Sequence, residues 1–98
     1  MRPEARDIKI TPRGDYDQAT AGWLVQQVEH ALVEGATAIV VDLDELAFGG
    51  STLISDIIRS QGRCAEHGAA FRLSAESAHW HRLFRIAGVS YLLDSEDE

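Results

Sequence analysis

The residues best placed to do chemistry in this sequence are Ser51 and Thr52, two hydroxyl side chains that directly follow Gly49 and Gly50. Glycines together with the first turn of a helix present backbone N–H groups to an anion, so this pattern is compatible with phosphate binding. The lysine of a Walker A loop is absent, which argues against nucleotide hydrolysis. The same residues also fit a structural role, in which Ser51 caps the helix and the glycines make a tight turn. An anion or nucleotide site and a plain helix cap both remain open.

Catalysis and metal binding find little support in the other polar residues. A serine nucleophile needs a base within reach, yet no histidine is paired with Ser51 by a recognisable spacing and a Gly-x-Ser-x-Gly elbow is absent. His79 and His81 are two positions apart and would point to different faces of a helix, so they make a poor metal pair. The acids at 42–45 follow a strand and are interpreted as a solvated turn. We therefore expect no enzymatic activity, no metal and no cofactor.

Size and charge narrow the range of functions further. The chain has 98 residues, which fits one small domain over 1–98 with flexible ends at 1–6 and 95–98. Its formal net charge of −7 disfavours nucleic acid and anionic membranes as partners, since both select Lys and Arg. No apolar run approaches the roughly 18 residues of a membrane span. The charged N-terminus lacks a signal-peptide pattern and Cys64 is the single cysteine, so we expect a cytoplasmic protein.

The elements that must position Ser51 follow from the periodicity of the apolar residues. An apolar run over 36–43 predicts a buried strand. The chain then passes through an acidic elbow and a short apolar segment, and the spacing over 51–67 predicts a helix that starts at Ser51. The inner face of that helix is expected to carry Leu53, Ile54, Ile57, Ile58 and Cys64 with Ala65.

The remaining elements complete an alternating order of strands and helices. Alternation at 8–10 predicts a strand that ends by Pro12 and lies at a sheet edge. Residues 14–17 are a turn by composition, and Asp17 is a plausible N-cap for a helix over 18–34. A strand over 69–73, a helix from Ser74 or Ser77 to Ala87 and a short strand over 89–93 follow.

Strands separated by helices require crossover connections, which favour parallel pairing. The sequence therefore predicts an α/β fold in a single domain. Its sheet would be small, mainly parallel or mixed, with about four strands and three main helices packed on it.

Four blocks in this order resemble the STAS domain, the fold of anti-sigma factor antagonists. The block Gly14-Asp15-Tyr16-Asp17-Gln18-Ala19-Thr20-Ala21 is similar to the family's Gly-Glu-Leu-Asp-x-x-Thr-Ala. Residues 40–48 are similar to its apolar strand, Asp-Leu and apolar-x-Phe elbow. Ser51 and Thr52 then match the family's Asp-Ser-Ser/Thr-Gly-Leu, and residues 82–89 its Arg-Leu-Phe-x-x-x-Gly-Leu helix end. The resemblance spans about residues 8–93.

The chain departs from the family pattern at two positions next to the matched serine. Gly50 stands where the family has Asp, and Leu53 stands where it has Gly. The family Asp lies beside the phosphorylated hydroxyl, and the family Gly lies where a partner approaches closely. The sequence before Ile8 also leaves little room for the family's extra first strand.

The function implied by the resemblance is a partner switch. The unmodified antagonist binds an anti-sigma factor, often a GHKL-type serine kinase, and phosphorylation of the serine blocks that binding. The resemblance makes Ser51 the phosphoacceptor, with Thr52 as the second choice, and another STAS protein is a further class of partner. The contact residues it implies are Gly14, Asp15, Asp17, Gly49, Gly50, Ser51, Thr52 and Leu53.

Two alternatives to the switch stay open. Because Gly50 and Leu53 alter the motif, the domain could serve as a binding module or assembly subunit of a signalling complex that is not phosphorylated. The helix start could instead bind a small anionic ligand or nucleotide.

Overall fold

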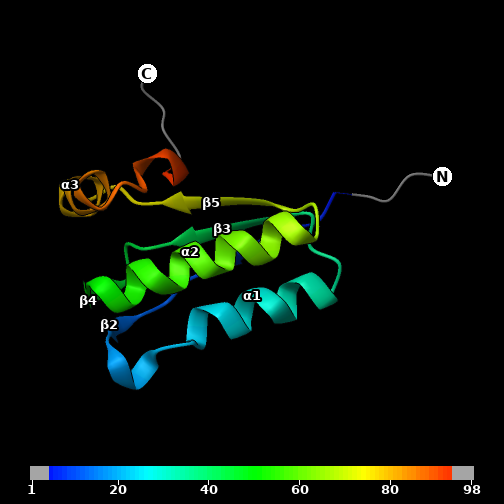
Figure 1. The fold of residues 1–98 in the computed structure, drawn as a ribbon, viewed down its shortest axis with the longest axis horizontal. Coiled ribbons are helices and arrows are strands. Elements are labelled where there is room, and N and C mark those ends of the chain that lie inside the picture. The colour runs from blue at the N-terminus through cyan, green and yellow to red at the C-terminus, as the bar shows by residue number, and fades with distance from the viewer. Residues whose placement is uncertain (1–4, 94–98) are drawn as a thin grey trace.

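A computed structural model describes residues 5–93 of the chain as a layer of parallel strands with helices packed against it (Figure 1). The larger sheet has the order β1-β3-β5, and a smaller sheet pairs β2 with β4; all these pairings are parallel. The strands are β1 (Asp7–Ile10), β2 (Gly14–Tyr16), β3 (Ala38–Asp42), β4 (Leu46–Gly49) and β5 (Ala70–Ser74). The helices are α1 (Trp23–Val33), α2 (Ser51–Glu66) and α3 (Ala78–Ala87), with 3-10 turns η1 (Gln18–Thr20) and η2 (Ser90–Leu92).

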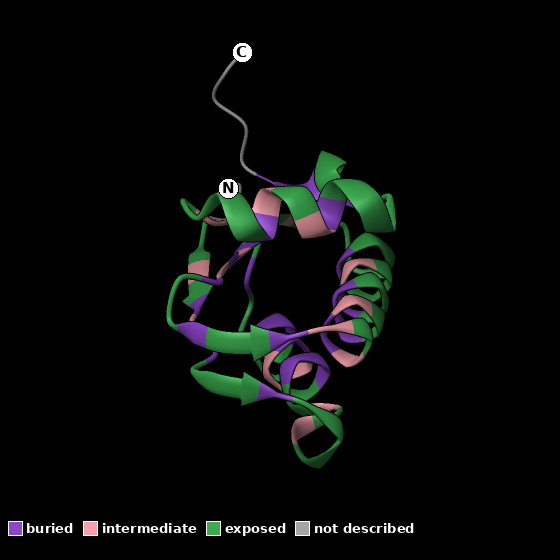
Figure 2. Cartoon of the chain, turned by 90° about the vertical axis from the view of Figure 1, so that its left-hand side faces the viewer, coloured by how far each residue is buried: buried purple, intermediate pink, exposed green. Residues whose placement is uncertain are grey.

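The predicted α/β class, with a mainly parallel sheet and three main helices, is confirmed. Helices α1 and α2 lie side by side, and Figure 2 shows α2 and the strands on opposite sides of a buried interior. Ile39 and Val41 of β3 point into this interior and are fully buried. The alternate residues of β3 are only half-buried, so the sheet is covered by helices mainly on one face. As predicted, β1 is an edge strand that ends before Pro12.

The segment 14–17, predicted to be a turn, contains strand β2 instead. Gly14 to Tyr16 pair in parallel with β4, which lies in the short apolar segment that follows the acidic elbow. Each strand is only three or four residues long, so neither shows a periodic pattern by itself. Their pairing depends on a contact between segments about 30 positions apart, which local sequence does not reveal.

The predicted final strand over 89–93 is wrong. The segment forms η2, and within residues 5–93 its only strand-type pairing with the sheet is a single bridge between Leu93 and Leu73. Its buried residues are Val89, Leu92 and Leu93, while Tyr91 is exposed. That spacing of i, i+3 and i+4 fits a helical turn rather than the alternation of a strand.

The helix predicted to start at residue 18 starts at Trp23. Asp17 does act as an N-cap, but it caps η1, where its carboxylate accepts from the backbone N–H of Ala19 at 3.0 Å. Gly22 then adopts a left-handed conformation with φ of 91°, which breaks the helical path between η1 and α1. At the third helix, the structure selects Ser77 over Ser74, because the Ser77 hydroxyl accepts from the N–H of His79.

The inner face of α2 is narrower than predicted. Leu53, Ile57 and Cys64 are fully buried, whereas Ile58 is 47% exposed and Ala65 is exposed as well. Consecutive residues on a helix are rotated by about 100°, so the neighbours of two core residues turn outward. Two polar residues, Asp56 and Ser60, take the remaining buried positions.

The predicted flexible ends fall largely outside the described residues. Of the described part, Arg6 is held to the domain, since its N–H donates to Thr37 Oγ1 at 2.7 Å and its guanidinium to the carbonyl of Glu34. Over residues 5–93, none of the helices has the length and apolar content that crossing a membrane requires.

Cys64 gives the fold a testable pH dependence. Burial raises the pKa of its thiol to about 11. The unfolded chain releases this proton near its ordinary pKa of about 8.5, so the contribution of Cys64 to stability is complete below that pH and is lost as the pH rises. Urea unfolding between about pH 8 and pH 11 should show a steeper loss of stability in the natural chain than in Cys64→Ser. Parallel pH profiles for the two proteins would contradict this assignment.

Candidate functional site

Ser51 is the first residue of α2 and its side chain is exposed. Gly50 is the N-cap, and no side chain caps this helix. The interpretation of Ser51 as a plain helix cap is therefore wrong. A hydroxyl in the first turn of a 16-residue helix lies at the positive end of the helix dipole, where a negative charge is stabilised.

Gly49 and Leu53 fix the path of the chain into α2. Gly49 is buried at the end of β4, and a Cβ added there would lie 2.6 Å from Leu53 Cδ2 and 3.3 Å from the Trp80 ring. Leu53 is itself fully buried, so its side chain packs into the core instead of facing a partner. The bulk of Leu53 and the missing side chain of Gly49 thus complement each other.

A hollow of about 370 Å³ lies beside Ser51 and Thr52. The amide of Gln18, from η1, donates to Thr52 Oγ1 at 3.4 Å and so joins two distant segments across it. The hollow is lined by Gln18, Ala21, Ser51, Thr52, Ser55, Asp56 and Arg59. These side chains are mostly polar, and the cationic Arg59 is paired with Asp56 at 3.6 Å.

The predicted contact residues of the 14–17 segment come close to Ser51 through the β2–β4 pairing. Asp15 is opposite Phe48 and Tyr16 is opposite Gly49. Gly14 and Asp15 are exposed, and Asp17 is exposed at the start of η1. The structure therefore gathers both predicted segments, at 14–17 and at 49–52, on one end of the molecule.

Of the acids interpreted as a solvated turn, Asp44 and Glu45 are exposed in a turn, whereas Asp42 is the half-buried last residue of β3. Asp42 is 3.4 Å from Lys9, and Glu45 is 3.3 Å from Arg13. Asp44 accepts from the backbone N–H of Glu76 at 3.0 Å. These contacts anchor the loop after β3.

Sequence reasoning missed Asp56, a carboxylate with only 2% of its surface exposed. Its Oδ2 accepts from the Tyr16 hydroxyl at 2.6 Å and from the backbone N–H of Gly22 at 2.7 Å. The Tyr16 oxygen in turn accepts from the N–H of Leu24 at 2.8 Å. Burial, followed by the hydrogen bond to Asp56, raises the pKa of Tyr16 far above its usual value. An acid on the apolar stripe of the predicted helix, between Leu53 and Ile57, was the available signal.

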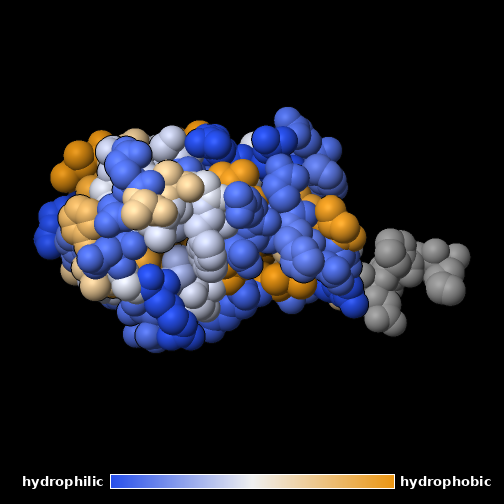
Figure 3. All heavy atoms as spheres, turned by 90° about the horizontal axis from the view of Figure 1, so that it is seen from below, coloured by the Kyte–Doolittle hydropathy of each residue, from blue (hydrophilic) through white to orange (hydrophobic). Residues whose placement is uncertain are grey.

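Phe48 is the second residue that was missed as a site residue. Its ring is 56% exposed on β4, and its Cζ lies 4.0 Å from the position that a Cβ on Gly50 would take. Phenylalanine, like the other aromatic residues, is enriched in protein interfaces relative to the rest of the surface. The face of the molecule in Figure 3 is mostly hydrophilic with separate hydrophobic patches. Phe48 is a contact candidate because its exposed ring lies next to Gly50, the residue that precedes Ser51.

Comparison with known proteins assigns the family. The family described as "Mlab, STAS domain" matches residues 2–94. The chain belongs to the STAS-domain family. No curated protein sequence matches it.

Three solved structures share the fold of this chain. The unphosphorylated form of the anti-sigma factor antagonist SpoIIAA has a TM-score of 0.77 at 15% identity, covering 99% of this chain and 86% of its own. An anti-sigma factor antagonist from Mycobacterium paratuberculosis has a TM-score of 0.74 at 19% identity, with coverages of 89% and 74%. The phosphorylated form of Bacillus SpoIIAA has a TM-score of 0.69 at 16% identity, with coverages of 99% and 89%. The fold of this chain is therefore similar to that of anti-sigma factor antagonists.

The Asp56 network predicts a large effect for the loss of a single oxygen atom. Tyr16→Phe removes one donor from the buried carboxylate and one acceptor from Leu24, so we expect a loss of about 1–3 kcal/mol in urea unfolding. Tyr91→Phe is the matched control, because its hydroxyl bonds to Gln61 at 3.1 Å on an exposed surface. That control should change stability by less than about 0.5 kcal/mol. Equal effects of the two variants would contradict the role given to Asp56.

The complementarity of Gly49 and Leu53 predicts that Gly49→Ala is destabilising. The added methyl group would overlap Leu53 in a well-packed core, and such overpacking costs about 1–3 kcal/mol. Gly50→Ala is the control, since only the Phe48 ring, at 4.0 Å, comes near its added methyl group. Thermal unfolding followed by circular dichroism should lower the Tm of Gly49→Ala more than that of Gly50→Ala. A lower Tm for Gly50→Ala than for Gly49→Ala would contradict the role given to the close packing of Gly49 against Leu53.

Proposed function

We propose that this STAS domain is an anti-sigma-factor-antagonist-like regulator in the cytoplasm. It binds an anti-sigma factor through the start of α2 and the neighbouring end of β2, and it has no catalytic step of its own. One observation carries the proposal: Ser51 is exposed in the first turn of α2, on a fold shared with SpoIIAA, which has been solved in both phosphorylated and unphosphorylated forms. The partner is a GHKL-type serine kinase.

The contact surface in this proposal combines backbone and side-chain groups from three elements. Phe48 supplies exposed apolar area, and Ser51 with Thr52 supplies the hydroxyls at its edge. Gly14 and Asp15 border it through the β2–β4 pairing, and Asp17 follows β2 as the N-cap of η1. Gly49 and Leu53 support the surface from below, since both are buried.

Phosphorylation of Ser51 would change this surface without unfolding the domain. A phosphate adds about −1.5 to −2 charges at neutral pH. The first turn of a helix favours such a charge by about 0.3–1 kcal/mol. A docked anti-sigma factor, in contrast, would meet new charge and the cost of desolvating it. Binding is therefore switched off while the fold is retained.

A second candidate function keeps the binding and drops the switch. It is favoured by Gly50, which has no carboxylate where the family has Asp beside the acceptor hydroxyl. In this case the domain is a constitutive binding module or assembly subunit of a signalling complex. The hollow beside Ser51 gives less support to a small anionic ligand or nucleotide, because its cation, Arg59, is already paired with Asp56.

The switch predicts opposite results for two substitutions at Ser51. Ser51→Ala should bind the anti-sigma factor that co-purifies with the natural chain as tightly as that chain does. Ser51→Asp should weaken binding at least about tenfold in calorimetry, because it places charge inside the contact. Ser90→Asp, at an exposed serine of η2, is the matched charge control and should bind normally. Equal affinities for the two Ser51 variants would contradict the proposed switch.

Intact-mass measurement after incubation with that partner and ATP separates the two candidates. One added phosphate, lost in Ser51→Ala and retained in Thr52→Ala, supports the switch. No added phosphate on the natural chain, with binding intact, supports the constitutive module. If only Gly50→Asp gains a phosphate, the missing carboxylate at position 50 explains why the natural chain is not phosphorylated.

A further inference from the structure

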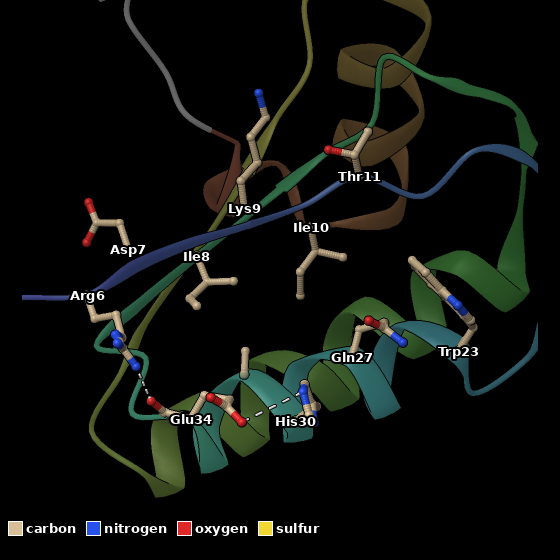
Figure 4. A pocket seen from close by; sticks show the side chains of 11 residues that line it. Arg6, Asp7, Ile8, Lys9, Ile10, Thr11, Trp23, Gln27, His30 and Glu34 are labelled. Carbon is tan, nitrogen blue, oxygen red and sulfur yellow. Dashed lines mark hydrogen bonds and ion pairs between the residues drawn. The ribbon is translucent and has the colours of Figure 1, made fainter.

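Strand β1 presents an open edge. It pairs with β3 on one side, and no segment within residues 5–93 pairs with it on the other. Figure 4 shows β1 running beside α1, with a groove of about 810 Å³ between them. This edge shares no lining residue with the hollow beside Ser51, so the inference is independent of the proposed function.

The backbone of β1 directs its free hydrogen-bonding groups outward at Asp7 and Lys9. The carbonyl of Arg6 accepts from the N–H of Thr37 at 2.9 Å and therefore faces β3. Backbone groups along a strand alternate in direction, so those of Ile8 face β3 as well, and those of Asp7 and Lys9 point to the open side. An unpaired row of this kind is a template for another strand.

The side chains of β1 divide by face in the same alternating way. Ile8 and Ile10 point toward α1, and Asp7 and Lys9 point away from it (Figure 4). Asp7 and Lys9 thus place opposite charges two positions apart on one face of an exposed edge. The Lys9 side chain is 65% exposed, although it also lies 3.4 Å from Asp42.

We propose that the open edge of β1 pairs with the β1 of a second copy of this chain, antiparallel and centred on Ile8. In this register, Asp7 of each copy is opposite Lys9 of the other. Both residues have outward backbone groups, so each such pair exchanges two N–H to C=O hydrogen bonds. Ile8 is opposite Ile8 as a non-hydrogen-bonded pair, whose side chains approach closely. The two larger sheets join into one.

Charge selects a second copy over an unrelated strand, and one register over the others. Charged residues on an edge strand usually discourage pairing. Here the two charges have opposite sign and equal distance from Ile8, so a two-fold axis at Ile8 makes them self-complementary. A pairing centred on Asp7 or Lys9 would instead bring like charges together, which is destabilising. The sequence of β1 therefore favours its own copy in one arrangement.

The groove beside α1 offers a partly apolar surface to the β1 strand of the second copy. Trp23 of α1 is 36% exposed, and Gln27 and His30 continue the same lining. Ile8 of the second copy would approach this side of the strand, since it points toward α1 within its own copy. Because β1 is only four residues long, the interface is small and the dimer is in concentration-dependent exchange with monomer.

Sedimentation equilibrium of the full chain over a wide concentration range tests the pairing. We expect reversible dimerisation of the natural chain. Asp7→Lys and Lys9→Asp should each raise the dimer Kd about tenfold, because each turns both cross-strand pairs into like charges. The double variant Asp7→Lys/Lys9→Asp should restore the natural Kd.

Mixing the two single variants in equal amounts provides the sharpest test. Each variant alone carries one sign of charge on its edge, so the mixture should form a heterodimer with all cross-strand pairs attractive. A misfolded variant could not be rescued in this way. Asp42→Asn controls for the loss of the Lys9–Asp42 ion pair and should dimerise like the natural chain. A natural chain that stays monomeric at about 1 mM, or single variants that dimerise as it does, would overturn the proposal.

Discussion

The buried carboxylate of Asp56 is the constraint on which the rest of the domain depends. A charge with 2% of its surface exposed must be hydrogen-bonded, because an unpaired one would cost far more than the domain can supply. Its partners come from β2 through Tyr16 and from the entry to α1 through the N–H of Gly22. Satisfying this one side chain therefore fixes α2 against two earlier segments of the chain at once. The hollow beside Ser51 lies between α2 and residues 18–21, the segment that connects β2 to α1.

The site combines a closely packed backbone with an exposed side chain that can be modified. Gly49, Leu53 and Trp80 pack closely where β4 enters α2, so the backbone that carries Ser51 has little freedom. Ser51 itself is exposed and makes no capping bond. A charge change at this hydroxyl would alter recognition while leaving the packed layer untouched, which is what a regulator that works by contact requires. Gly50 keeps the backbone geometry of the helix start but brings no carboxylate to it.

The domain also separates its two candidate contact surfaces. The end that carries Ser51 offers an exposed aromatic ring and hydroxyls, which suit a partner with a shaped apolar surface. The edge of β1 offers backbone groups and two opposite charges, which suit a strand of matching charge. Because no residue lines both surfaces, one copy of the chain could occupy its edge while the other surface remains free. Both surfaces belong to a domain with one hydrophobic core, which includes Ile39 and Leu73.

The sequence by itself determined the α/β class, the long helices and the position of Ser51 at a helix start. These follow from local periodicity, as in the apolar stripe of α1 and the uninterrupted run that forms β3. Only the tertiary structure decided that residues 14–16 are a strand, that the last segment is a 3-10 turn, and that Gly50, not Ser51, is the N-cap. It also revealed Asp56 and Phe48 as parts of the site region. The pairing of residues 14–16 with β4 joins segments far apart in the chain, and such a contact leaves no local pattern. The spacing at 89–93 and the acid at position 56 were local signals, but packing against distant segments decided which structure they form.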